Sequence, residues 1–462
     1  MLPVVAMQNS PGWLHPARLT AVGFLALILL GTGLLMLPTS AVGEHATPFL
    51  PAFFTATSAV SLTGLIVVDT ATYWQPSGQA IILALIQLGG LGIMTLAALS
   101  GMVLTGRISL RARQRTAAEG RPVIHGSIKH TLVSTLAVTL LCEAVVAGVV
   151  GTRVWCTGQV SVARAAWVGV FHAISAFNNA GFSTYSDNLA GFSHDAWVLI
   201  PLAFALIVGG LGYPVLAEVL RLARGIATRA LHRTHPRVHR VSITAKMTFI
   251  ATLVLLVGGT GFLLAVEWNG WFSGMPVGTR ILNAFFQAAS PRTAGFNTMD
   301  YDQAHPITLM GTDVLMFIGG GSAGTAGGVK VTTACVLIAS MAAEFLGRED
   351  TTVGRRRLPL TVVRQALALA VAGIAVIAFG VAVLRIFDPQ FTGDQVTLEV
   401  VSAFATVGLS TGITAKLTAA SQVTLCFIMY LGRVGPTTLV AALAARSFPH
   451  RYRYPEERPF IG

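Results

Sequence analysis

The sequence predicts an all-α integral membrane protein, and two features of its composition carry that prediction. Of the 462 residues, 53% are hydrophobic and only 11% are charged, whereas soluble domains carry roughly 25% charged residues. Mean hydropathy is +0.69, and uncharged runs long enough to cross a bilayer recur along the chain. This composition excludes a soluble enzyme, a disordered protein and a secreted disulfide scaffold. The four cysteines have no CxxC spacing, so we expect them to fill space only.

Eight long apolar segments are predicted to cross the membrane, because a spanning helix needs about 20 apolar residues. In chain order they are 19–43, 70–106, 128–151, 196–220, 244–266, 308–345, 362–385 and 420–445. Four shorter segments lie between alternate pairs of spans, at 48–60, 165–178, 279–291 and 394–406. Segments this short cannot cross a bilayer. They suit re-entrant half-helices that are buried within protein.

Basic residues gather in alternate connections between the spans. Segments 106–126, 221–246, 347–364 and 446–462 contain 21 of the 31 lysines and arginines but only five of the 19 acidic residues. The positive-inside rule therefore predicts that these segments and both termini are cytoplasmic. This placement also accounts for the formal net charge of +12, so we expect no nucleic-acid partner.

A fourfold internal repeat organises the chain. The short segments end in AVSLTGL, AFNNAGF, SPRTAGF and FATVGLS, and their anchoring glycines Gly64, Gly181, Gly295 and Gly408 are separated by 117, 114 and 113 residues. The following spans keep nearly the same period in a second slot, filled by Gly90, Gly210, Gly320 and Arg433. Chance glycines would not keep two motifs in register. We therefore predict four packed units around one axis.

The predicted architecture is four tandem helix–pore-helix–helix repeats, with eight transmembrane helices and four re-entrant pore helices around a central pore. The predicted boundaries are 1–105, 127–220, 243–346 and 361–446, followed by a cytoplasmic tail at 447–462.

The glycine loops are suited to hold a cation. Glycine adopts backbone angles closed to other residues, so successive carbonyl oxygens can turn toward the axis. Carbonyls replace the hydration shell of an ion without placing net charge in a pore. Four converging helix C-termini add partial negative charge, which attracts a cation and repels an anion.

These motifs resemble the Trk/Ktr/HKT superfamily of cation transporters, and among them the bacterial Ktr-type membrane subunit. The matching stretches are FFTATSAVSLTGLIVVDT (53–70), SAFNNAGF, RTAGFNT, GGSAGTAGGVKVTT (320–333) and GRVGP (432–436), so the resemblance covers about Ala52 to Thr438. It implies potassium uptake across the bacterial cytoplasmic (inner) membrane through a carbonyl-lined selectivity filter. The implied filter residues are Leu62, Thr63, Gly64, Asn179, Ala180, Gly181, Thr293, Ala294, Gly295, Thr406, Val407 and Gly408.

The resemblance also bears on the cargo and the partners. Plant relatives that prefer sodium replace the first filter glycine with serine, so Gly64 favours potassium; a sodium-coupled or less selective monovalent cation transporter is the alternative. The resemblance implies a homodimer seated on a cytoplasmic ring of RCK-type subunits that bind ATP, ADP or NAD. No organic cofactor is expected on this chain. A membrane-embedded enzyme would need clustered Asp, Glu or His at a membrane face, and the sequence has no such cluster.

The span at 308–345 is interrupted by GGGSAGTAGGVK at 319–330. Each glycine costs a helix about 1 kcal/mol, and irregular backbone at membrane depth is tolerated where it lines a cavity. The order Gly-Val-Lys-Val excludes a P-loop, which needs GK[ST]. The resemblance implies an intramembrane gating loop below the filter, formed by Gly319, Gly320, Gly321, Ser322, Ala323, Gly324, Thr325, Ala326, Gly327, Gly328 and Lys330.

Arg433 fills the slot that holds glycine in the other three repeats. An arginine at membrane depth costs roughly 2.5–3.5 kcal/mol on insertion scales, which points to a functional role. The resemblance places it beneath the filter, as an electrostatic barrier and an anchor for the gating loop. The sequence leaves open the roles of Lys330 and of Glu399, which lies nine residues before Gly408.

Overall fold

The structure, a computed structural model, describes residues 16–43, 46–106, 128–212, 215–222, 241–322, 324–354 and 356–445. These residues form helices joined by loops, with one small hairpin of β1 (Thr352–Val353) and β2 (Arg356–Arg357). The predicted all-α fold class is therefore confirmed. The cytoplasmic tail expected at 447–462 lies outside the described residues, and the predicted repeat boundaries stay predictions.

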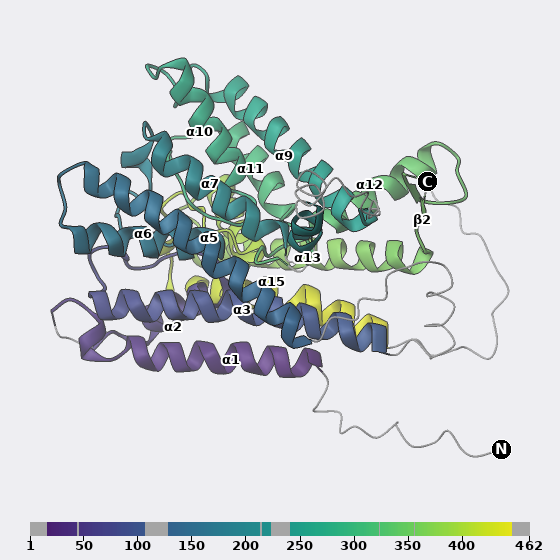
Figure 1. The fold of residues 1–462 in the computed structure, drawn as a ribbon, viewed down its shortest axis with the longest axis horizontal. Helices are drawn as coiled ribbons and strands as arrows, with labels where there is room; N and C mark the ends of the chain where they lie inside the picture. Colours follow the sequence, from purple (N-terminus) through teal and green to yellow (C-terminus); the bar gives the residue numbers. More distant parts are fainter. Residues whose placement is uncertain are drawn as a thin grey trace, which may run out of the picture.

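Long helices occupy the expected spans (Figure 1). They are α1 (Pro16–Leu35), α3 (Pro76–Gly106), α5 (Ile128–Cys156), α9 (Ile243–Glu267), α13 (Leu360–Phe387) and α15 (Ala419–Ala445). Helix α7 (Ala196–Leu211), of 16 residues, fills the first part of the span expected at 196–220. The segment expected at 308–345 is two helices, α11 (Pro306–Phe317) and α12 (Val331–Phe345), so the predicted interruption is present.

Short helices fill the four intervening segments. They are α2 (Phe49–Ser61), α6 (Val162–Phe177), α10 (Val277–Ala289) and α14 (Gly393–Ala405). Local sequence sets two of their starts: the Ser161 side chain accepts a hydrogen bond from the Arg164 amide, and Thr392 with Gln395 forms a capping box at α14. Their C-terminal halves are largely buried, whereas the long helices expose wide apolar faces.

Within the described residues, three helices are both long and apolar enough to cross a membrane unbroken: Val133–Cys156, Ile243–Glu267 and Leu360–Phe387. A fourth span qualifies only as a bent pair, in which Ala196–Leu211 and Val215–Leu222 meet at 110°. The segment expected to span at 196–220 is therefore broken after Leu211. The bend follows Leu211 at Gly212, whose φ of +87° is a conformation that favours glycine.

The first expected span is also shorter than predicted. The apolar run continues to residue 43, but α1 ends at Leu35, and Pro38 begins a separate short 3₁₀ helix, Pro38–Ser40. Proline has no backbone N–H to continue a helix, and it disfavours helical geometry in the residue before it.

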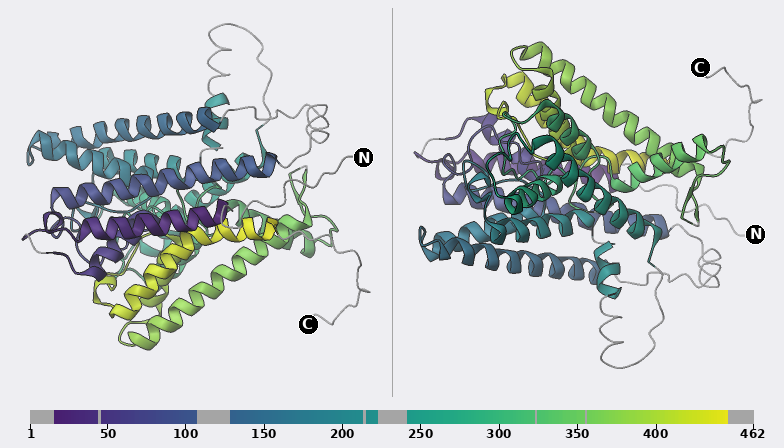
Figure 2. Two further views of the ribbon diagram at one scale, coloured as in Figure 1. Left: turned by 90° about the horizontal axis from the view of Figure 1, so that it is seen from below. Right: turned by 90° about the horizontal axis from the view of Figure 1, so that it is seen from above.

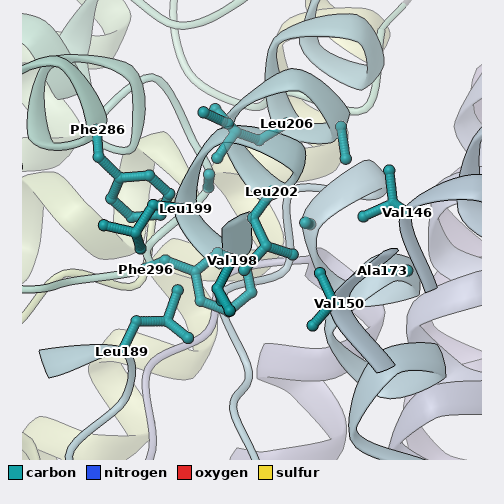
Figure 3. Packing of buried hydrophobic residues seen from close by; sticks show 14 of the residues in the cluster. Val146, Val150, Ala173, Leu189, Val198, Leu199, Leu202, Leu206, Phe286 and Phe296 are labelled. Carbon is teal, nitrogen blue, oxygen red and sulfur yellow. The ribbon is translucent and has the colours of Figure 1, made fainter. Parts of the chain in front are cut away.

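Apolar packing joins the second and third units. Val146 and Val150 of α5 lie in one buried cluster with Leu202 of α7, and the same cluster includes Phe286 of α10 and Phe296 in the loop after it (Figure 3). Each of these side chains is almost fully removed from solvent. Helix α10 of the third unit thus packs against α7 of the second.

The two ends of the helical chain meet. Helix α15 packs against α1 and α2, and Figure 2 shows this last helix running beside the first. The hydroxyl of Tyr430 donates a hydrogen bond of 2.8 Å to the carbonyl of Ala21. The fourth unit therefore contacts the first, and the units close on one another.

Candidate functional site

The loops that follow the four short helices share one backbone path. Two residues before each loop glycine stands a non-glycine residue with positive φ, between 52° and 84°; these are Leu62, Asn179, Thr293 and Thr406. Among the described residues, Asn188 is the other non-glycine residue in this region. Such conformations cost on the order of 1–3 kcal/mol and persist where the surroundings enforce them. The same costly turn therefore recurs at the same repeat position.

The loop glycines, which are Gly64, Gly181, Gly295 and Gly408, form a closed ring. A Cβ built on Gly64 would lie 3.1 Å from Cα of Gly181, and one on Gly181 would lie 3.2 Å from Cα of Gly295. A Cβ on Gly295 would lie 3.2 Å from Cα of Gly408, and one on Gly408 would lie 2.9 Å from Cα of Gly64. The loops therefore follow one another in chain order around one axis.

Backbone carbonyls surround this ring. The Cβ built on each loop glycine would also meet a carbonyl oxygen of the next loop, at 2.5 Å for Gly64 and 2.8 Å for Gly181. The four carbonyls belong to Ala180, Ala294, Val407 and Thr63. All four loop glycines have positive φ, from 70° to 98°. A side chain at any of these positions would thus strain the backbone, and it would also clash with a carbonyl oxygen of the next loop.

A serine near the end of each short helix braces the loop that follows it. Ser58 Oγ accepts from the Gly64 amide at 3.0 Å, and Ser402 Oγ accepts from the Gly408 amide at 2.9 Å. In the middle units the serine hydroxyls donate to carbonyls instead, from Ser175 to Phe182 and from Ser290 to Phe296. Sequence reasoning missed these contacts. The available signal was a serine six residues before the loop glycine in three of the four units.

Replacing Ser58 with alanine is expected to destabilise the first loop. The change leaves the buried Gly64 N–H without its acceptor, and such a loss costs about 1–3 kcal/mol. We expect a lower melting temperature for the detergent-purified protein and weaker protection of that melting temperature by potassium. Ser77→Ala, at an exposed hydroxyl, is the control. Equal melting curves for the two variants would contradict the bracing role.

The interruption between α11 and α12 is a loop whose described residues, 318–322 and 324–330, are held by backbone hydrogen bonds. Ile318 and Val329 form a parallel bridge, with the Gly319 amide donating to the Val329 carbonyl at 2.9 Å. The loop also binds the end of α7, because the Gly321 amide donates to the Gly210 carbonyl at 2.8 Å. All expected loop residues are described except Ala323, which lies outside the described residues.

This loop lies against three of the four glycine loops. With the Asn179 amide nitrogen donating to the Leu206 carbonyl at 3.1 Å, its oxygen accepts from Thr325 Oγ1 at 2.7 Å. A Cβ on Gly327 would meet Thr406 Oγ1, and one on Gly319 would lie 3.5 Å from Thr293 Cγ2. The loop residues therefore contact the residues with positive φ in the second, third and fourth units, which are Asn179, Thr293 and Thr406.

Two cations bind carbonyls of this loop. Arg433 is 4% exposed, and its Nη1 donates to the Thr325 carbonyl, while its Nε and Nη2 are buried without a hydrogen-bond partner. Lys330 Nζ donates to the neighbouring Ala326 carbonyl. The ion pairs found in the described part of the chain, Arg153–Asp195 and Arg357–Asp350, involve neither cation. No carboxylate there neutralises the guanidinium.

Two acidic side chains lie in segments next to the glycine loops, one in the helix before the fourth loop and one in the connection after the first. Glu399 is fully buried in α14; one carboxyl oxygen accepts from Thr414 Oγ1 and the other has no partner. Asp69, in the connection after the first loop, accepts from Ser186 Oγ of the second at 2.6 Å. Burial opposes ionisation of Asp69, but hydrogen bonds from Ser186, Thr72 and Ala71 outweigh it and lower its pKa below the ordinary value. The first two loops are thus tied by a charged group.

An all-helical membrane protein in which four short buried helices end at one ring of glycine loops is a membrane transport protein. The chain belongs to the TrkH family of cation transport proteins, whose pattern it matches over residues 15–449. Members of this family move ions across membranes and are not enzymes.

Individual relatives agree with this assignment. The chain is 36% identical over 448 residues to the Ktr system potassium uptake protein B of Bacillus subtilis, covering 97% of each chain. It is 34% identical over 459 residues to the potassium/sodium uptake protein NtpJ of Enterococcus hirae, covering 97% of this chain and 98% of that protein. The fold is similar to that of the potassium transporter TrkH from Vibrio parahaemolyticus, with a TM-score of 0.66, 19% identity and coverage of 92% of this chain and 85% of the other.

Proposed function

We propose that this chain takes up potassium across the cytoplasmic membrane of a bacterium, and that the ring of glycine loops is its selectivity filter. The observation that carries the proposal is the closed contact of the four loop glycines, each against the next. A ring of carbonyls can replace the water shell of a cation, as potassium-selective pores do. The name of the Bacillus relative, a potassium uptake protein, supports the choice of ion.

The polarity of the short helices supports a cation as the cargo. All four end at the ring, so their C-terminal partial negative charges converge there. In this proposal the filter comprises the positive-φ residue, the residue after it and the glycine in each loop, which are the residues that the resemblance implies. Of the twelve filter residues all but Gly408 are buried, which keeps the local dielectric low and strengthens the attraction of each carbonyl for the ion.

The 318–330 loop and Arg433 form the proposed gate. The loop contacts the left-handed residues of three units from one side of the ring, and the arginine holds its Thr325 carbonyl. An unneutralised guanidinium near the ion path would repel a passing cation. Conduction in this scheme requires that the loop and the arginine move together.

Control of the gate is proposed to come from a separate RCK-type nucleotide-binding subunit, with the chain acting as a homodimer. The basic segments on the predicted cytoplasmic side are the candidate docking sites. The β1–β2 hairpin, with Arg356 and Arg357, belongs to one of them and lies at the same end of the molecule as the start of α1 (Figure 1). This arrangement fits a cytoplasmic N-terminus.

A sodium-coupled or less selective monovalent cation transporter is the second candidate function. The name of the Enterococcus relative, a potassium/sodium uptake protein, favours it. Gly64 favours potassium as the transported ion, because the resemblance associates serine at this position with sodium preference. The two candidates differ in their dependence on external sodium.

Growth and uptake in a bacterial strain without its own potassium uptake systems test the proposed function. Wild-type protein, expressed alone and together with an RCK-type subunit of a Ktr system, is expected to restore growth at low potassium. Initial uptake rates with and without sodium then separate the two candidate functions. Membrane insertion without potassium uptake under either condition of expression would contradict the proposal.

A further inference from the structure

A buried polar cluster links three helices beside the second glycine loop. Asn178 Nδ2 donates to Glu143 Oε1 of α5 at 3.1 Å and to Gln87 Oε1 of α3 at 2.9 Å. Gln87 Nε2 in turn donates to Glu143 Oε2 at 3.3 Å. Asn178 is fully buried and Glu143 is 5% exposed. Both carboxyl oxygens of Glu143 are thus occupied by amide donors from neighbouring helices.

The cluster holds Asn178, the residue just before the positive-φ turn of the second loop. Asn178 is the C-terminal cap of α6, and the next residue, Asn179, has the left-handed backbone of the ring. The Ile174 carbonyl lies 3.0 Å from Asn178 Nδ2 and shares one of the two N–H groups of that nitrogen. These contacts fix the end of α6 against α3 and α5.

The matching residues of the other units are held differently. Ser61 bonds Thr63 within its own loop at 2.7 Å, Arg292 reaches Thr252 of α9 at 3.1 Å, and Ala405 has no polar side chain. The second loop is thus the one tied through a carboxyl group to two other helices.

The Asn178 side chain fits against helix α3 because Gly90 has no side chain. A Cβ built on Gly90 would meet the Asn178 side-chain oxygen and lie 2.8 Å from its Cγ. Gly90 stands in the repeat slot that holds Arg433 in the fourth unit. The side chain of Asn178 cannot swing aside freely, because its nitrogen is bound to Glu143, Gln87 and Ile174.

We propose that Glu143 is a positioning residue for ion selectivity: it holds Asn178 in place and thereby holds the second loop in the ring. This inference rests on the proposed function of the ring as a potassium filter. Glu143 acts through Asn178 and is not placed on the ion path. A functional site needs its groups held to within about 0.5 Å, and a buried amide that loses its acceptors moves to regain hydrogen bonds.

The sharpest test moves Asn178 without touching Glu143 or the loop. Gly90→Ala introduces a methyl group against the Asn178 oxygen, whereas Gly92→Ala, on the same helix, meets only Phe24 at 3.8 Å. We expect Gly90→Ala to lower the potassium-to-sodium uptake ratio about tenfold and to raise the half-saturation concentration for potassium. The maximal rate per inserted molecule should change less than twofold. Gly92→Ala should behave as wild type.

Variants of the carboxyl residue complete the test. Glu143→Leu should lower the potassium-to-sodium uptake ratio as Gly90→Ala does. Glu143→Gln keeps an acceptor for Asn178 and should have at least half of the wild-type ratio. A purely structural residue would reduce the amount of inserted protein and leave the ratio unchanged. The inference is overturned if inserted Gly90→Ala and Glu143→Leu proteins keep the wild-type ratio.

A filter variant separates this inference from the function on which it rests. Gly181→Ser alters the second loop itself, because its Cβ would lie 2.8 Å from the Ala294 carbonyl. If Gly181→Ser loses selectivity while Gly90→Ala and Glu143→Leu keep it, the positioning role of Glu143 is rejected and the ring remains the proposed filter. If Gly181→Ser also keeps wild-type selectivity, the ring is not the filter.

Discussion

Replacing Gly64 with serine is expected to lower the potassium-to-sodium selectivity of uptake roughly tenfold. The serine Cβ would lie 2.5 Å from the Ala180 carbonyl and 3.1 Å from Cα of Gly181, so one of the two loops must move. Displacing one of four carbonyl positions by a few tenths of an ångström should cost bound potassium about 1.4 kcal/mol, which is a factor of ten in affinity. Competition of sodium with rubidium or potassium uptake, in cells without other uptake systems, measures the ratio.

Backbone strain alone must be separated from distortion of the ring. Gly274 provides the matched control, because its φ is +79° and a Cβ there would have no neighbour within 4 Å. Gly274→Ser therefore carries a similar conformational cost outside the ring and should retain selectivity. If Gly64→Ser retains it as well, the first loop does not contribute to discrimination between the two ions.

The fold was predictable because its signals are periodic and local. Apolar runs marked the long helices, and the shared spacing of Gly64, Gly181, Gly295 and Gly408 placed the four loops. The break between α11 and α12 followed from glycine content alone. The bend at Gly212 was missed because the glycines of GGLG at 209–212 also suit close packing against a neighbouring helix, as the same motif does at 89–92.

The contacts that define the site were less visible in the sequence. The left-handed backbone at Leu62 and Thr406 has no compositional signal, because neither residue type favours that conformation. Glu143 and Asn178 are 35 residues apart, and Gln87 and Asn178 are 91 apart. A single sequence does not reveal which of several buried polar residues meet across helices. The order of the four loops around the ring is likewise a property of the folded chain and not of any one sequence segment.

Removing the charge of Arg433 is expected to raise potassium flux. Two like unit charges about 8 Å apart repel by about 2 kcal/mol at an effective dielectric constant near 20, and removing such a barrier would raise a rate roughly thirtyfold. Arg433→Ala should therefore conduct faster than wild type, above all when no regulatory subunit is present. Deletion of 321–327 should have the same direction, since it removes the Thr325 carbonyl that Arg433 holds.

Charge and anchoring can be told apart by two conservative variants. Arg433→Lys keeps a positive charge but not the fork of guanidinium donors, whereas Arg433→Gln keeps a donor for the Thr325 carbonyl without the charge. If repulsion dominates, the glutamine variant conducts faster than wild type and the lysine variant does not. If anchoring dominates, the lysine variant conducts faster and the glutamine variant resembles wild type. If an inserted Arg433→Ala protein transports no faster than wild type, both proposed roles of Arg433 are contradicted. Neither the buried charge nor its bond to the loop would then limit the passage of the ion.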